Sequence, residues 1–332
     1  VTATVSTCFF FSSLIVIEKG MEGYPEMLSF FLLFCAWLSW FSFGIQRGRW
    51  NTAWFVSFSF CGFAFYTAGW EALFYFFVPL IFMRRPLSIW SRMNRIGFYS
   101  GLAALAFFVV IWSYPRWLDG QNIPFRNIAQ DISVGYPKQL LLYPLEFFLR
   151  TFPWIFILWP VFCAAYESLE RNPIFSRYLK TIFFTLFIMN WIVPSTDPRK
   201  YPLMMIPLAI LAGSQYEIFT RRNSIKLNSI LLCITYILGL MSFCAIIFYV
   251  VPDSWLAGIK FLDKGVSFRT EHRILGLSQC VLSMIFCALT AWRAHMLKLP
   301  NFLHMLSHST VIMLIFWALG APYRSQDSEQ RK

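Results

Sequence analysis

A short polar segment between two apolar runs carries the residues best suited to chemistry. It reads Ser-Thr-Asp-Pro-Arg199-Lys200-Tyr201, between the apolar runs 181–193 and 203–213. Two adjacent cations at the mouth of an apolar helix are costly unless they meet water, headgroups or an anion. Arginine binds phosphate through a bidentate fork, lysine acts as a point charge, and tyrosine donates a hydroxyl. These three residues are therefore predicted to hold a phosphate. In the simpler alternative the two cations only anchor a helix end.

Carboxylates gather in a second segment, 18–26. Glu18, Glu22 and Glu26 fall within nine residues at the end of the apolar run 3–17. Three acids are many for an ordinary connection, so this segment is a candidate for acid chemistry. The alternative is a solvated turn.

A long connection, 114–143, carries aromatic residues together with Arg116 and Arg126. Aromatic side chains favour the headgroup level of a membrane, so this segment is expected to lie flat and wall a cavity. It is equally well explained as an interfacial helix alone.

Two spaced pairs add to these segments. Glu146 and Arg150 are four residues apart, which lets them pair on one helix face, and a structural role is favoured over a catalytic one. His304 and His308 have the same spacing, which suits two metal ligands. Without a nearby carboxylate, an interfacial position is favoured for this histidine pair, and no metal or other cofactor is predicted.

Composition sets the class of protein that must position these residues. Of 332 residues, 58% are hydrophobic and only 13% are charged, which is typical of an integral membrane protein. The net charge of +12 is spread over the connections without a basic block, which argues against a nucleic-acid partner. The eight cysteines form no C-x-x-C pair and are expected to be small core residues.

Eleven apolar runs predict the architecture. The fold class is all-α: a polytopic transmembrane helical bundle of about eleven spans, with short interfacial helices on the outer face. Lys and Arg are concentrated in alternate connections, which are assigned to the cytoplasm. The runs are 3–17, 27–44, 51–66, 71–83, 97–113, 144–166, 181–194, 202–215, 227–251, 273–294 and 305–320.

Three segments, in order, resemble the C-type membrane glycosyltransferases (GT-C), in particular bacterial protein mannosyltransferase-like and lipid A aminoarabinose transferase-like enzymes. The strongest match is Ser195–Gly213, with its Arg199-Lys200-Tyr201-Pro202 and later Pro207. The resemblance covers residues 1 to about 225. It implies a membrane glycosyltransferase domain over 1–225, followed by helices of unassigned role over 226–332. The other two matching segments are Tyr143–Pro160 and Arg47–Pro79.

The chain also departs from the family pattern. Ala68 stands where the family often has Lys, Trp70 where it often has Pro, and Pro25 where it has Asp, with Glu26 next to it. The family's catalytic Asp lies in an earlier outer loop, which would precede Val1. We therefore expect the chain to be the C-terminal part of a longer protein.

The resemblance implies transfer of a sugar from a polyprenyl-phosphate donor to a lipid, glycan or protein acceptor. The reaction would take place on the outer face of a membrane, most simply the bacterial inner (plasma) membrane. Arg199, Lys200 and Tyr201 would hold the donor phosphate, with Arg116 or Arg126 as a further cation. The upstream Asp would act as general base. Glu22 and Glu26 are the candidate catalytic carboxylates of this chain and would orient the acceptor.

Two other functions stay open. A multi-span transporter or flippase for a lipid-linked solute also needs cations in the membrane and broken helices. The chain shows no internal repeat, which counts against it. The other is a non-catalytic partner subunit with the same fold, which the departures at Ala68 and Pro25 favour slightly.

Overall fold

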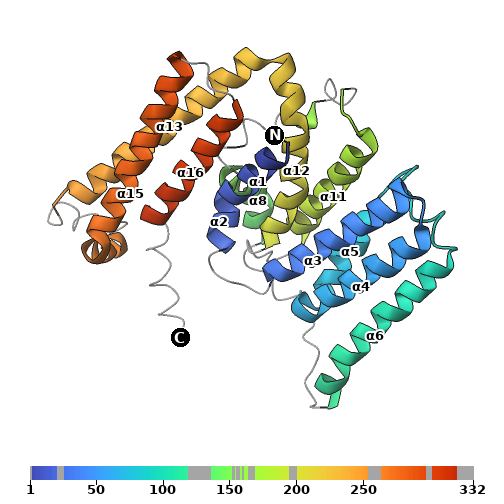
Figure 1. Ribbon diagram of the computed structural model, residues 1–332. Coiled ribbons are helices and arrows are strands. Elements are labelled where there is room, and N and C mark those ends of the chain that lie inside the picture. Colours follow the sequence, from blue (N-terminus) through green and yellow to red (C-terminus); the bar gives the residue numbers. More distant parts are fainter. Residues whose placement is uncertain are drawn as a thin grey trace. The chain divides into compact units, whose positions relative to one another are not determined.

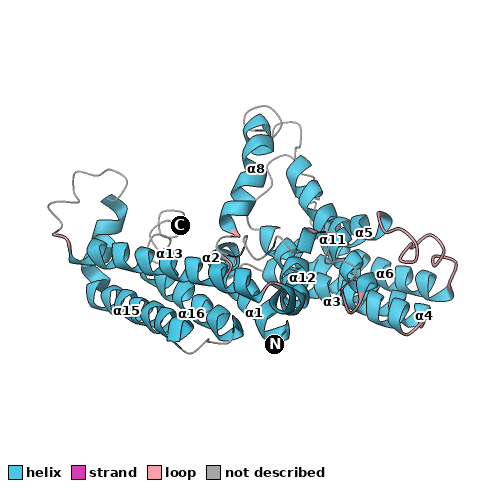
Figure 2. Cartoon of the chain, turned by 90° about the horizontal axis from the view of Figure 1, so that it is seen from above, coloured by secondary structure: helices cyan, strands magenta, loops and turns pink. Residues whose placement is uncertain are grey.

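The computed structural model contains helices and no strand among the residues that it describes, as Figure 2 shows. The all-α prediction is confirmed. The described residues are 2–20, 26–118, 136–151, 154, 158, 161–163, 169–193, 200–252, 263–296 and 301–319.

Within these residues, five helical segments are long and apolar enough to cross a membrane. The chain is therefore an integral membrane protein, as its composition predicts. Three further apolar helices are shorter, and the count of about eleven spans stays a prediction. The five segments are Glu26–Gln46, Ile96–Pro115, Tyr201–Arg222, Ser224–Val250 and Arg273–Met296.

Contacts divide the chain into two units. The central unit comprises Lys19–Arg150 and Glu167–Leu211, and the terminal unit comprises Val1–Glu18, Thr151–Tyr166 and Ala212–Lys332. The predicted division into 1–225 and 226–332 rests on the family resemblance of the first part, and it stays a prediction.

In the central unit, α4 packs against α3, α5 and α6 (Figure 1). Aromatic residues fill this core: Trp40 stacks on Tyr178 with ring centroids 5.9 Å apart, and the Tyr178 hydroxyl donates to the carbonyl of Trp37. The elements of the unit are α3 (Glu26–Ser39), the π-helix η1 (Trp40–Gln46), α4 (Trp50–Ala68), α5 (Trp70–Ile81), α6 (Ile96–Leu118), α8 (Tyr136–Arg150), α11 (Pro173–Ile192) and the first half of α12 (Tyr201–Arg222).

Two local signals set the helix ends that matter for the site. Gly69 has φ of +60°, a conformation that L side chains rarely adopt, and it ends α4 and starts α5 within one residue. At the start of α11, Pro173 follows Asn172, whose side chain accepts a hydrogen bond from the amide of Phe175.

In the terminal unit, α13, α15 and α16 pack against one another, and α1 packs against α16 (Figures 1 and 2). The Tyr249 hydroxyl on α13 donates to the carbonyl of Ala318 on α16. The elements are α1 (Thr2–Ser12), α2 (Leu14–Gly20), the second half of α12, α13 (Ser224–Val250), α15 (Asp263–Met296) and α16 (Asn301–Leu319).

Candidate functional site

Lys200 lies directly before α12, at the point where the predicted phosphate-binding segment enters the helix. Its Nζ is 2.8 Å from Oε1 of Glu71, in the first turn of α5. Gly69 ends α4 and is followed at once by α5, which places Glu71 in the first turn of α5. The two side chains differ in exposure, 17% for Lys200 and 51% for Glu71. An ammonium has three donors, so Lys200 retains capacity for a further acceptor.

Tyr201, the next residue, belongs to a buried aromatic cluster. Its ring meets Tyr143 edge-on at 5.2 Å between centroids and lies near Phe147, both on α8. Only 2% of Tyr201 is exposed. Burial of three rings fixes the start of α12 against α8, and this holds the backbone that carries Lys200.

A second cation reaches the same cluster from α8. The guanidinium carbon of Arg150 lies 5.9 Å from the centre of the Tyr201 ring, and an Arg150 nitrogen lies 2.5 Å from Glu146 Oε1. The predicted Glu146–Arg150 pair is therefore confirmed. Among the described residues, Arg150 is the arginine that joins the predicted phosphate segment.

The C-terminal end of α11 is tied to both neighbouring helices. Trp191 donates to the carbonyl of Leu140 on α8 at 2.8 Å. On the other side, the Tyr75 hydroxyl on α5 donates to Asn190 Oδ1 at 3.0 Å, and this bond is buried. Helix α11 thus links α5 and α8, the two helices whose side chains contact Lys200 and Tyr201.

An apolar hollow of about 600 Å³ runs along α5 and α11. Many of its side chains are exposed, among them Phe184 and Ile188 on α11 and Phe82 just after α5. Polar groups occur mainly towards the N-terminal part of α11. The lining comprises Val78, Phe82, Arg177, Lys180, Thr181, Phe184, Thr185, Ile188, Met189, Ile192 and Val193.

Of the two predicted carboxylates, Glu26 is described and Glu22 lies outside the described residues. Glu26 is the first residue of α3, where the helix dipole favours a negative charge. Its Oε2 is shielded from solvent and has no hydrogen-bond partner among the residues described.

The remaining predicted cations are not placed. Arg199 and Arg126 lie outside the described residues, and the side chain of Arg116, within α6, is likewise not described. Their phosphate-binding roles stay predictions, as does that of the Tyr201 hydroxyl.

The histidine pair belongs to the terminal unit and is packed inside it. His304 and His308 are 0% and 1% exposed, and the membrane-interface position expected from the sequence stays a prediction. Nε2 of His308 lies 2.7 Å from the Thr235 hydroxyl on α13. Periodicity alone did not show that this face of α16 packs inward. No group of three or more His, Cys, Asp or Glu suited to a metal occurs in the described part of the chain.

Glu71 is the site residue that sequence analysis left unassigned. A signal was present, because it is the single carboxylate between Glu26 and Asp119. An ionisable residue at the start of an apolar helix is a functional candidate with a partner to be found. Its partner is 129 positions away, which no local pattern indicates.

Solved structures with a fold similar to that of this chain are known. No family model and no curated protein matches the chain. Similar solved structures include ArnT from Cupriavidus metallidurans bound to undecaprenyl phosphate, with a TM-score of 0.63 and 16% identity over 96% of this chain. ArnT in the apo state gives a TM-score of 0.60 and 14% identity, again over 96% of this chain.

ArnT is a lipid A aminoarabinose transferase of the GT-C class. The GT-C resemblance is thus confirmed at the level of the fold. The chain spans 59% and 58% of the length of these two structures.

Proposed function

We propose that this chain is part of a membrane glycosyltransferase that moves a sugar from a polyprenyl-phosphate donor to an acceptor on the outer face of the membrane. The observation that carries the proposal is that the Lys200 site and the apolar hollow share helix α5. Helix α5 supplies Glu71 to one and Val78 to the other. A lipid phosphate needs this combination of a cation and an adjoining apolar surface.

The cation supports the phosphate end. Lys200 is partly shielded and has donors beyond the one used by Glu71. Arg150 lies against the Tyr201 ring, where its charge is offset by Glu146, so Lys200 is the cation on which the proposal depends. A charge-assisted contact to a leaving phosphate strengthens as negative charge develops on it, so it favours the transition state over the bound donor.

The hollow supports the tail end. It follows α11 between Arg177 and Val193, and 16 steps of a helix correspond to about 24 Å, enough for several isoprene units. The C-terminal end of the hollow, at Val193, precedes Lys200 by a short connection. ArnT, which has this fold, has been solved with undecaprenyl phosphate bound.

In the proposed reaction, the acceptor hydroxyl attacks the anomeric carbon of the sugar. The bond from that carbon to the phosphate oxygen breaks, and the electron pair leaves with the polyprenyl phosphate. The hydroxyl proton passes to a general base. The family resemblance assigns that base to a separate aspartate, so Glu26, together with Glu22, is proposed to orient the acceptor.

The test is undecaprenyl phosphate binding by the full-length protein in detergent. Lys200→Ala and Arg199→Ala are each expected to weaken binding by about 1.5–3 kcal/mol, the range for a hydrogen bond to a charged group. The matched control is Arg221→Ala, at the far end of α12, where Arg221 pairs with Glu217. Thermal unfolding must be unchanged in all variants.

Unchanged binding in the Lys200 and Arg199 variants would reduce this segment to a helix anchor and contradict the proposal. Donor binding without sugar transfer in the full-length protein would instead favour the non-catalytic partner subunit.

A further inference from the structure

A second concentration of charge lies at the other end of α4 and α5 from Glu71. The stretch Trp40–Phe98 contains six arginines and one carboxylate, Glu71. All six fall in the connections 47–49 and 82–95, and neither connection holds an acid. They are Arg47, Arg49, Arg84, Arg85, Arg92 and Arg95.

Side-chain contacts bring the two connections together at the start of α4. The Trp54 indole donates to the carbonyl of Arg92 at 3.1 Å, and the amide of Gly97 donates to Asn51 Oδ1 at 3.1 Å. The guanidinium of Arg92 lies over the Trp50 ring, 4.6 Å from its centre. The arginines of both connections therefore share one end of the central unit. Glu71 is already paired with Lys200, and about 28 Å of helix separates the two ends of α4.

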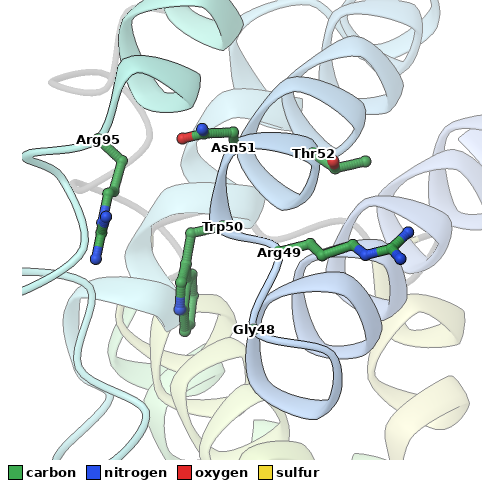
Figure 3. A pocket seen from close by; sticks show the side chains of 6 residues that line it. All are labelled: Gly48, Arg49, Trp50, Asn51, Thr52 and Arg95. Atoms are coloured by element: carbon green, nitrogen blue, oxygen red, sulfur yellow. The ribbon is translucent and has the colours of Figure 1, made fainter.

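A hollow of about 300 Å³ opens at this junction. Figure 3 shows Arg49 and Arg95 on opposite sides of the first turn of α4, with Trp50 and Asn51 between them. Arg49 and Arg95 are exposed, and neither side chain makes an ion pair or hydrogen bond among the residues that the structure describes. Thr52 and Gly48 complete the lining.

The surface beside the hollow is apolar. Phe55, one turn further along α4, is half exposed, and Ile96 and Tyr99 at the start of α6 are more so. The segment Ile96–Pro115 is a candidate membrane span of which only 17% is buried in the protein. A ligand bound here therefore meets cations and polar groups at one end and a lipid-facing helix surface at the other.

We propose that this hollow binds the phosphate headgroup of an anionic membrane phospholipid, with its acyl chains along α4 and α6. Arginine matches a phosphodiester through its planar fork, and an uncompensated guanidinium at a membrane surface attracts anionic lipid. A water-soluble anion would use the cations and leave the apolar face without a role. The site differs from the donor-phosphate site in position and residues, and its lipid is bound rather than consumed.

The test uses the full-length protein in detergent and compares dioleoylphosphatidylglycerol with dioleoylphosphatidylcholine by native mass spectrometry. The wild type is expected to bind the anionic lipid selectively. The double variant Arg49→Gln/Arg95→Gln is expected to lose about tenfold or more of that affinity, since it removes the charge-assisted hydrogen bonds that the two lining arginines make to the phosphate. The variant Arg49→Lys/Arg95→Lys, which keeps the charge, should recover part of it.

Arg84→Gln/Arg85→Gln is the matched control. It removes the same charge from the same end of the unit, outside the hollow, and is expected to change affinity by less than about threefold. Equal losses in both double variants would mean diffuse attraction and overturn the site, as would a wild type that does not distinguish the two lipids. Displacement of the lipid by 10 mM inorganic phosphate, against an equal concentration of chloride, would overturn the lipid as occupant. If the double variant fails to fold, Arg95→Gln alone carries the test, because the Arg95 side chain makes no hydrogen bond or ion pair in the described structure that the substitution would remove.

Discussion

Lys200 and Glu71 are 129 positions apart in the chain, yet they form an ion pair at 2.8 Å at the start of α12. The carboxylate of Glu71 is half exposed and occupies a donor of the ammonium to which a phosphate is proposed to bind. Glu71 would therefore compete with an incoming phosphate, while it keeps Lys200 ordered when no donor is bound.

Neutralising this competitor should strengthen phosphate binding. Glu71→Gln is expected to raise the affinity for undecaprenyl phosphate about threefold, since an exposed ion pair contributes up to about 1 kcal/mol. Isothermal titration calorimetry in detergent measures the affinity of the wild type and of the variant for undecaprenyl phosphate. Glu217→Gln, which breaks the Arg221 pair instead, should leave affinity unchanged. Weaker binding in Glu71→Gln would show that the carboxylate positions Lys200 rather than competing for it.

The Tyr201 ring and the Tyr201 hydroxyl are expected to have separable roles. Tyr201→Ala should lower the free energy of unfolding by about 3–5 kcal/mol, because the ring is 2% exposed within the α8 cluster. Tyr201→Phe keeps the packing, and if the hydroxyl donates to the phosphate it should weaken undecaprenyl phosphate binding by about 1 kcal/mol.

Tyr143→Phe is the control in the same cluster, since its hydroxyl contacts Met204 Sδ at 3.6 Å. It should leave binding unchanged. Equal binding by wild type and Tyr201→Phe would restrict Tyr201 to a packing role.

The sequence predicted those features that depend on composition and local spacing. The all-helical membrane class follows from long apolar runs, and the Glu146–Arg150 pair follows from their four-residue separation on one helix. The segment predicted to bind phosphate was correctly expected to lead into a helix, which begins at Tyr201.

Features that depend on the packing of distant segments were not predictable in this way. Nothing near Glu71 in the sequence indicates Lys200, and nothing near Tyr201 indicates that Arg150 lies over its ring. The burial of His304 and His308 was missed for a related reason. In an apolar helix the lipid-facing and protein-facing sides have similar composition, so hydropathy does not distinguish them.

The close approach of α6 to α4 depends on a glycine. A Cβ on Gly97 would lie 2.1 Å from Asn51 Cα, and backbone cannot yield as a flexible side chain does. Gly97→Ala is therefore expected to lower the free energy of unfolding by about 1–3 kcal/mol. Gly239→Ala, within α13, meets only Cys287 Cβ at 3.7 Å and should be neutral or stabilising by up to about 1 kcal/mol. The stabilities of the two variants are compared by thermal unfolding in the same detergent. Equal stability would contradict the close approach of Gly97 to the backbone of Asn51.

The buried histidine pair should make stability sensitive to one hydroxyl. The Thr235 hydroxyl lies within hydrogen-bond distance of both the Leu231 carbonyl and Nε2 of His308. Thr235→Val keeps the shape but removes the hydrogen-bond partner of Nε2, at an expected cost of about 1–2 kcal/mol in thermal unfolding. The exposed Thr310→Val is the control, expected to change stability by less than about 0.5 kcal/mol. Equal effects would mean that the contact with His308 contributes nothing.

Filling the apolar hollow should separate tail binding from phosphate binding. Ile188, on α11, lines the hollow and is 47% exposed, so Ile188→Trp adds bulk there without disturbing a packed core. Loss of about 55 Å² of apolar contact costs about 1.4 kcal/mol, so undecaprenyl phosphate should bind about tenfold more weakly. A short-chain prenyl phosphate, which relies mainly on Lys200, should bind as before.

Ile247→Trp on α13 is the control, because Ile247 has nearly the same exposure, 45%, but does not line the hollow. An equal loss for the long and short lipids would indicate that the substitution disturbs the phosphate end. No loss for either would exclude the hollow as the tail site, whatever the outcome at Lys200.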